Sequence, residues 1–122
     1  MIINRRARRD YRIGDEYEAG RCNAEDAIGH PTPVGSYPRG VSPHGCYDMA
    51  GNVFEWCADR FGPDYYKKDE NRNPKGPDEG EYRLVRGGSW NYHQDFARCA
   101  CRGWVRPDRR FDNLGVRFSR TP

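Results

Sequence analysis

Prolines and glycines are so dense in residues 21–45 that this part of the chain cannot form a helix. Proline removes a backbone N–H and fixes φ, and glycine raises the entropic cost of regular structure. A second long polar stretch, residues 62–80, is also predicted to be a loop. The chain is therefore expected to consist of short strands in ordered loops, with little helix. The residues in 21–45 that decide this are Pro31, Pro33, Pro38, Pro43, Gly29, Gly35, Gly40 and Gly45.

The apolar content is low for a folded chain, but the aromatic content is high. Only 35% of the 122 residues are hydrophobic, whereas 13% are aromatic, including three Trp and eight Tyr. Disordered chains are poor in aromatic residues, so we expect one small domain with a small, aromatic-rich core. A metal ion or a partner subunit is expected to supplement so small a core.

Four segments have the composition of short strands. They are TPVGSY at 32–37, VFEWCAD at 53–59, YRLVRGG at 82–88 and NLGVRFSR at 113–120. The segment 82–88 is the clearest of the four, because its side chains alternate in character along the chain.

Charge and hydropathy limit the partners. Lys and Arg exceed Asp and Glu by only three, 21 against 18, so no specific nucleic-acid binding is predicted. No apolar run approaches the ~18 residues that a membrane span needs, and the charged first ten residues do not resemble a secretory signal. We therefore predict no membrane partner, a reducing cytoplasmic location and free thiols for the five cysteines.

Three ordered motifs carry a family resemblance. GCYDMAGNVFEWCAD at 45–59, LVRGGSW at 84–90 and FDNLGVRFSR at 111–120 follow the loop CNAEDAIGHPTPVGSYP at 22–38. Together they resemble the C-terminal half of the formylglycine-generating, sulfatase-modifying domain. The resemblance implies an α+β, C-type-lectin-like fold with short antiparallel strands. The implied functions are oxidation of a sulfatase cysteine to formylglycine, sulfoxide synthesis in ergothioneine biosynthesis, and non-catalytic binding, which includes retroelement-diversified variable proteins.

The resemblance also implies a division of the chain. It covers residues 21–122, while residues 1–20 are predicted to form an N-terminal arm. The family domain normally has a preceding half with two helices and a strand, which residues 1–20 do not resemble. We therefore expect a truncated domain whose open sheet edge pairs with another copy of the chain or with a complementing chain.

Two cysteines raise the question of copper chemistry. The family's oxidases carry a copper-binding pair, C-x-x-x-x-C, shortly after GGS[YW], and alignment on GGSW places Tyr92 and Ala97 at those positions. Cys99 and Cys101 lie just beyond. Thiolates suit copper(I), and the neighbouring arginines would lower the thiol pKa, so this pair remains a catalytic candidate. The favoured interpretation is two small side chains at packing or surface positions, without oxidase activity.

Two calcium sites follow from the resemblance. Calcium takes six to eight oxygen ligands, many of them from loop carbonyls. The alternative for each site is a loop whose carboxylates accept backbone N–H bonds. Carried over residue by residue, the first site consists of the Asp48 and Glu55 side chains with the Gly51 and Val53 carbonyls. The second, which spans a length difference, consists of the Asn23 and Asp26 side chains with the Ala24 and Ile28 carbonyls.

The favoured function is a calcium-stabilised, non-catalytic binding domain for a protein or small-molecule ligand. The ligand face is expected on residues 90–112, which mix aromatic and arginine side chains, the types enriched at binding hot spots. One alternative is a formylglycine-generating copper oxidase or a component of a related oxidase. Another is a retroelement-diversified variable protein in which this segment varies. The predicted face consists of Trp90, Tyr92, His93, Phe96, Arg98, Arg102, Trp104, Arg106 and Phe111.

Overall fold

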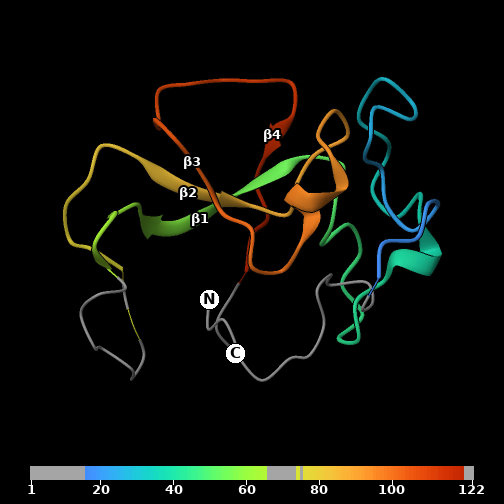
Figure 1. The fold of residues 1–122 in the computed structure, drawn as a ribbon, viewed down its shortest axis with the longest axis horizontal. Helices are drawn as coiled ribbons and strands as arrows, with labels where there is room; N and C mark the ends of the chain where they lie inside the picture. The colour runs from blue at the N-terminus through green and yellow to red at the C-terminus, as the bar shows by residue number, and fades with distance from the viewer. Residues whose placement is uncertain (1–15, 66–73, 75, 120–122) are drawn as a thin grey trace.

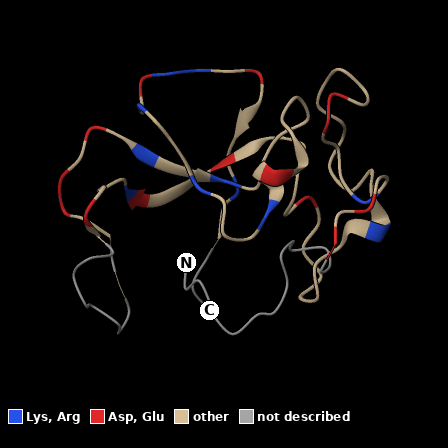
Figure 2. Ribbon diagram, in the orientation of Figure 1, with Lys and Arg blue, Asp and Glu red and all other residues tan. Residues whose placement is uncertain are grey.

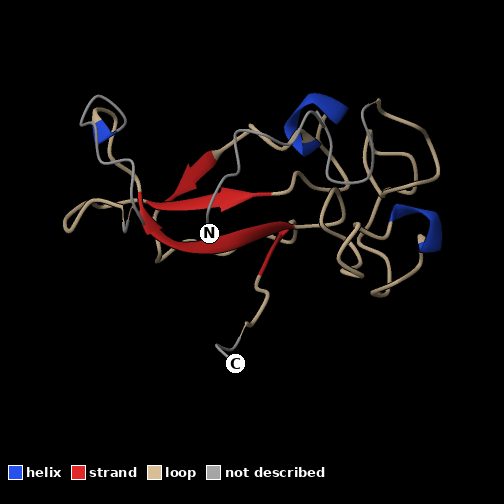
Figure 3. Cartoon of the chain, turned by 90° about the horizontal axis from the view of Figure 1, so that it is seen from below, coloured by secondary structure: helices blue, strands red, loops and turns tan. Residues whose placement is uncertain are grey.

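The computed structural model describes residues 16–65, 74 and 76–119 as a small curved sheet with long loops beside it (Figures 1 and 3). The loop-rich character and the scarcity of helix agree with the sequence. The strands are β1 (Phe54–Arg60), β2 (Arg83–Arg86), β3 (Gly103–Val105) and β4 (Leu114–Gly115), and the 3-10 turns include η1 (Pro38–Gly40) and η3 (Gln94–Ala97).

The four strands lie in the order β3-β2-β1-β4. The β1–β2 and β2–β3 pairs are antiparallel, as expected, but β4 runs parallel to β1 and pairs Phe54 with Leu114. A bulge between Trp56 and Arg60 interrupts the β1–β2 register, and β-bulges bend the strand that contains them. The sheet is therefore mixed, with β3 and β4 at its edges.

The predicted strand at 53–59 is confirmed within one residue at each end, and the one at 82–88 is confirmed over its centre. The predicted alternation of β2 is not found, because Leu84, Val85 and Arg86 are all buried. β2 lies between two other strands, and its side chains pack on both faces. An inner strand covered on both faces loses the in–out pattern.

The predicted strand at 32–37 is wrong. The Ser36 N–H donates to the Pro33 carbonyl, which closes a turn, and Gly35 has a φ of 81°. The Gly35 N–H donates to the Asp48 carboxylate at 2.8 Å instead of to a neighbouring strand. Hydrogen bonds within the turn and to Asp48 therefore take the place of the strand-to-strand hydrogen bonds that were expected in this segment.

The predicted strand at 113–120 is mostly wrong, since only Leu114 and Gly115 pair with β1. A strand at Gly103–Val105 was not predicted at all. This strand is only three residues long, which is too short for hydrophobic alternation to be recognised in the sequence. Its central Trp104 is 53% exposed.

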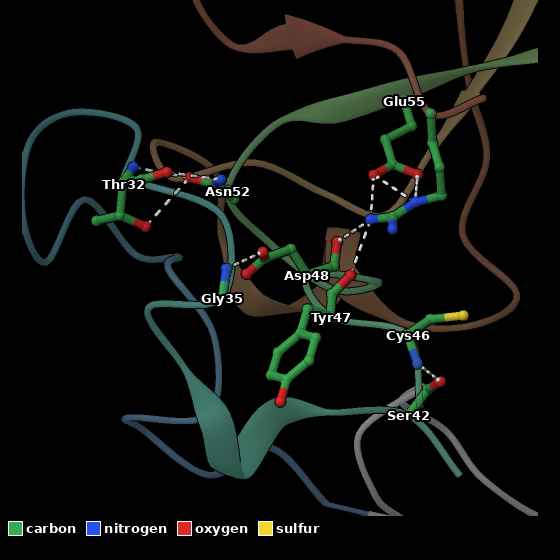
Figure 4. A network of polar contacts seen from close by, with 9 residues as sticks. Thr32, Gly35, Ser42, Cys46, Tyr47, Asp48, Asn52 and Glu55 are labelled. Carbon is green, nitrogen blue, oxygen red and sulfur yellow. Dashed lines mark hydrogen bonds and ion pairs between the residues drawn. The ribbon is translucent and has the colours of Figure 1, made fainter. Parts of the chain in front are cut away.

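The loops are fastened by Asn52, which has a left-handed φ of 65°. Its side-chain oxygen accepts the Thr32 N–H at 2.9 Å, and its amide nitrogen donates to the Thr32 carbonyl at 3.1 Å (Figure 4). Its backbone N–H donates to the Asn23 carbonyl, and its own carbonyl accepts from the Trp90 N–H. One asparagine thus joins three segments that are far apart in the sequence.

The core beside these loops is built from small side chains. Cys22, Ala24, Ala50 and Ala97 form its buried cluster, and Tyr17 packs against it. Burial raises the pKa of the Cys22 thiol to about 11, which keeps it neutral at physiological pH. The expected small core is present, but this cluster is not aromatic-rich.

Part of the predicted arm contacts the loops. Glu18 forms ion pairs with Arg21 and Arg39, the former at 2.7 Å. The remainder of the predicted arm, residues 1–15, lies outside the described residues.

Within the described ranges, no helix is long and apolar enough to span a membrane.

Candidate functional site

An aromatic pocket of about 380 Å³ lies over the sheet, and this volume is typical of small-molecule sites. All four strands contribute to its lining. We use the name aromatic pocket for the cavity lined by Phe54, Tyr92, Phe96, Trp104 and Phe111.

The rings of the aromatic pocket are held by edge-to-face contacts. Phe54, which is 8% exposed, meets Tyr92 at a centroid distance of 5.1 Å, and Tyr92 meets Phe96 at 5.0 Å. Trp104 stacks on Phe61 at 4.4 Å. Trp104 and Phe111 remain about half exposed. A buried ring therefore anchors a row of accessible ones, an arrangement that offers apolar contact area to a ligand.

The segment that carries Tyr92 and Phe96 is fixed by polar contacts. His93 caps η3, since its Nδ1 accepts the Asp95 N–H at 3.3 Å. The Glu25 carboxylate accepts the Gln94 N–H at 2.6 Å and lies 3.7 Å from His93 Nε2. These contacts orient the two rings before any ligand arrives.

The structure places five of the nine predicted ligand-face residues at the pocket: Tyr92, Phe96, Arg102, Trp104 and Phe111. Sequence reasoning missed Phe54, Val85 and Leu114, which line it from β1, β2 and β4. Strand periodicity was the signal that could have placed them, because side chains that share a face alternate along each strand.

The other four predicted face residues do not line the pocket. Trp90 is half-buried and its backbone bonds to Asn52 and Asp26, while His93 caps η3. Arg98 pairs with Asp95 at 3.3 Å, and Arg106 lies 3.5 Å from Asp108. Figure 2 shows acidic residues among the basic ones in the loop between β3 and β4, so this edge carries mixed charge.

Cys99 and Cys101 are half-buried and partly engaged through their backbone. Arg86 donates to the Cys99 carbonyl, and the Cys101 N–H donates to the Arg98 carbonyl. Burial raises the pKa of Cys101 and outweighs the opposing effect of the Arg86 charge. The expectation of a lowered thiol pKa is therefore wrong for Cys101.

In the first predicted calcium site, the Glu55 and Asp48 side chains contact different protein groups. The Glu55 carboxylate is bound by the Arg117 guanidinium at 2.6–3.0 Å, whereas the Asp48 carboxylate is directed to the Gly35 N–H (Figure 4). Gly51 is buried with a φ of 72°, and Val53 directly precedes β1. The two carboxylates thus have separate protein partners.

The second calcium site suits a cation better. Asn23 is 1% exposed, and its Oδ1 is buried without a hydrogen-bond partner among the described residues. An unsatisfied buried acceptor costs about 1–3 kcal/mol, which a bound cation would offset. Glu25 and Asp26 both have left-handed φ, at 62° and 55°, so the chain turns sharply beside this oxygen. Ala24 is buried and Ile28 is exposed within the same turn region.

A metal at either site would need backbone or amide oxygens in addition to its one or two carboxylates. In the part of the chain that the structure describes, no three His, Cys, Asp or Glu side chains gather where they could hold an ion.

Comparison with known proteins identifies the family. The model of the sulfatase-modifying factor enzyme 1-like domain matches residues 3–122. The chain belongs to this family. The match begins within the segment assigned above to an arm and includes every motif described. The C-type-lectin-like fold implied by the motifs is confirmed.

Three similar proteins show the range of this family. The chain is 40% identical to the serine/threonine-protein kinase pkn1 of Chlamydia caviae, over 90% of the chain and 18% of that protein. It is 40% identical to the formylglycine-generating enzyme of Streptomyces coelicolor, over 91% of the chain and 40% of that protein. The solved structure of Treponema denticola variable protein 1 superposes with a TM-score of 0.63 at 27% identity, covering 80% of this chain and 34% of that one. The chain thus spans less than half the length of these relatives.

Proposed function

We propose that this chain is a non-catalytic binding domain of the sulfatase-modifying factor family and that the aromatic pocket receives the ligand. The pocket is the observation that carries this proposal: about 380 Å³, lined by exposed rings around a buried Phe54. Arg102 also lines it. A protein or small-molecule ligand that presents an apolar or aromatic group beside a carboxylate would complement this lining.

The comparisons name enzymes as well as a variable protein, and none of the names gives a ligand for this chain. A similar stretch of sequence, 40% identical, occurs in proteins named as a kinase and as a formylglycine-generating enzyme. A domain that occurs in proteins of such different activity can serve as a binding module. The similarity to a variable protein favours a second candidate, a variable binding protein whose varied residues would line the same pocket.

The rival oxidase function depends on copper. Tyr92 and Ala97 stand where the resemblance places the copper cysteines, and Ala97 is buried in the small-residue core. The raised pKa of Cys101 also opposes thiolate formation at that position. These observations support a domain that does not use Cys99 and Cys101 for oxidation.

We predict that the purified protein binds no stoichiometric copper through Cys99 and Cys101. Anaerobic titration with copper(I) against a chromophoric competitor should give the same curve for the wild type and for the Cys99→Ser/Cys101→Ser variant. Cys46→Ser, at an exposed cysteine away from this pair, is the matched control. One equivalent of copper lost only in the double variant, with oxygen uptake on a cysteine-containing peptide, would establish the oxidase instead.

We further propose that calcium stabilises the domain through the Asn23–Ile28 turn. An ion there would complete the coordination of the buried Asn23 Oδ1, with Asp26 supplying charge. Chelation should then lower the melting temperature by about 5 °C, because a ligand bound only by the folded state stabilises it. Asp26→Ala should remove this sensitivity, whereas Asp112→Ala, an exposed carboxylate elsewhere, should keep it. Identical melting of the wild type with and without chelator would exclude the site.

A further inference from the structure

A second cavity, of about 500 Å³, lies on the face of the sheet opposite the aromatic pocket. The side chains of β2 show this arrangement. Leu84 and Arg86 line the second cavity, whereas Val85, between them, lines the aromatic pocket, and successive side chains of a strand point to opposite faces. Arg102 lines both cavities. The volume of the second cavity is within the range of small-molecule sites.

Arginines dominate the charged lining of this second cavity. Its four guanidiniums and two carboxylates give a formal charge of +2, since four positive groups face two negative ones. A cleft lined by an excess of one sign of charge concentrates ions of the opposite sign. We use the name arginine cavity for the cavity whose charged lining consists of Arg60, Arg86, Arg102, Arg117, Glu55 and Asp59.

One of the two carboxylates, Glu55, lies beside two of the guanidiniums. It binds Arg117 at 2.6–3.0 Å. The β1–β2 register also pairs it with Arg86, and directly paired residues of neighbouring strands project to the same face. Arg86 is 7% exposed and donates to the Cys99 carbonyl. A single carboxylate cannot neutralise two guanidiniums, so this part of the wall keeps an excess of positive charge.

Arg60 is positioned by a neutral group. Its Nη1 donates to the Gly80 carbonyl at 2.8 Å, and this bond uses one of the five N–H donors of a guanidinium. The contact orients the side chain at the cavity wall without cancelling its charge. A guanidinium held in this way suits carboxylate, sulfonate or phosphate oxygens, which match its planar fork of donors.

The arginine cavity also has an apolar wall, which includes Met49, Trp56, Leu84 and Pro77. Small-molecule sites typically combine such a wall with a few polar groups that orient the ligand. An inorganic anion would leave this wall without a contact. A ligand that complements the whole cavity therefore needs an apolar body as well as a negative charge.

We infer that the arginine cavity binds small organic anions, in which a carboxylate, sulfonate or phosphate group is attached to an apolar body. The anionic group faces the guanidiniums, and the body packs on Trp56 and Leu84. The first fifteen residues of the chain do not complement the cavity, because they contain five arginines and two aspartates. This site is separate from the aromatic pocket and does not depend on the function proposed for it.

The test is a fluorescence titration of the full chain with 8-anilino-1-naphthalenesulfonate, which carries a sulfonate on an aromatic body. We expect Arg60→Gln to raise the dissociation constant about tenfold, since it removes a charged hydrogen-bond donor. Arg83→Gln is the matched control and should bind nearly like the wild type. Arg83 pairs with Arg60 in the β1–β2 register and also donates to a backbone carbonyl, that of Ala58, but it does not line the arginine cavity.

A second variant and a second dye keep the test decisive. Ser119 is exposed and lines the arginine cavity, so Ser119→Asp should weaken binding of the sulfonate dye by like-charge repulsion with little effect on folding. N-phenyl-1-naphthylamine has the same rings without the sulfonate and should bind about tenfold more weakly or not at all. Circular dichroism in the near ultraviolet shows whether each variant keeps its native packing.

Four results would overturn the inference. The first is equal binding of the charged and uncharged dyes, and the second is unchanged affinity in both Arg60→Gln and Ser119→Asp. The third is loss of dye binding in Phe96→Ala, which would place the dye in the aromatic pocket. The fourth is no binding of the sulfonate dye by the folded wild type, which would favour a protein segment as the occupant. Each result is distinct from a failure of the aromatic pocket to bind its own ligand.

Discussion

Gly51→Ala is expected to destabilise the domain by about 4 kcal/mol, a large part of the roughly 5–15 kcal/mol that keeps a typical domain folded. Gly51 has a φ of 72°, where a side chain adds about 1–2 kcal/mol of strain. A Cβ at this position would also overlap the Asn23 carbonyl oxygen. That oxygen accepts the Asn52 N–H at 2.8 Å, so the loop cannot move away without breaking the bond that joins the two segments.

The Gly45→Ala variant separates the cost of backbone strain at a positive φ from the cost of steric overlap by the added Cβ. Gly45 has a nearly identical φ of 77°, but a Cβ there would meet no atom within 4 Å. Its cost should therefore stay at about 1–2 kcal/mol. Urea unfolding followed by tryptophan fluorescence gives both values. If the two variants unfold at the same urea concentration, a glycine is required at position 51 only because of its positive φ. The overlap of a Cβ with the Asn23 carbonyl oxygen would then add nothing to the loss of stability.

Sequence patterns located the inner strands but not the edges of the sheet. β1 and β2 contain hydrophobic runs, and their positions were predicted to within a few residues. β3 and β4 are three and two residues long, and their pairing depends on neighbours that are distant in the sequence. The segment 113–120 resembles a strand, yet beyond Gly115 its course is set by the Arg117 contacts to Glu55 and the 47–48 loop.

The candidate site was predicted in part for a similar reason. The segment after GGSW suggested Tyr92, Phe96 and Trp104, because a cluster of aromatic residues in one short stretch is visible in the sequence. Phe54 and Leu114 belong to strands and reach the aromatic pocket only through the β1–β4 pairing. The contact between Arg117 and the Glu55 carboxylate was not predicted, because the two residues lie 62 positions apart in the sequence.

The aromatic pocket leads to the second large prediction. Trp104 is 53% exposed in the pocket and stacks on Phe61, so it offers a rigid apolar surface to a ligand. Truncation of a hot-spot aromatic residue typically costs about 2 kcal/mol of binding free energy, or roughly a 30-fold loss of affinity. Tyr92→Ala should weaken binding as well, because its ring joins Phe54 to Phe96.

The most direct measurement is calorimetric titration with a peptide selected on the wild-type protein from a phage-displayed library. We expect Trp104→Ala to raise the dissociation constant roughly 30-fold. The Cys99→Ser/Cys101→Ser variant and Phe118→Ala, an exposed aromatic outside the pocket, should bind like the wild type. Circular dichroism of each variant establishes that it is folded. Unchanged binding by Trp104→Ala, together with loss of binding in the double serine variant, would contradict a binding function located in the aromatic pocket.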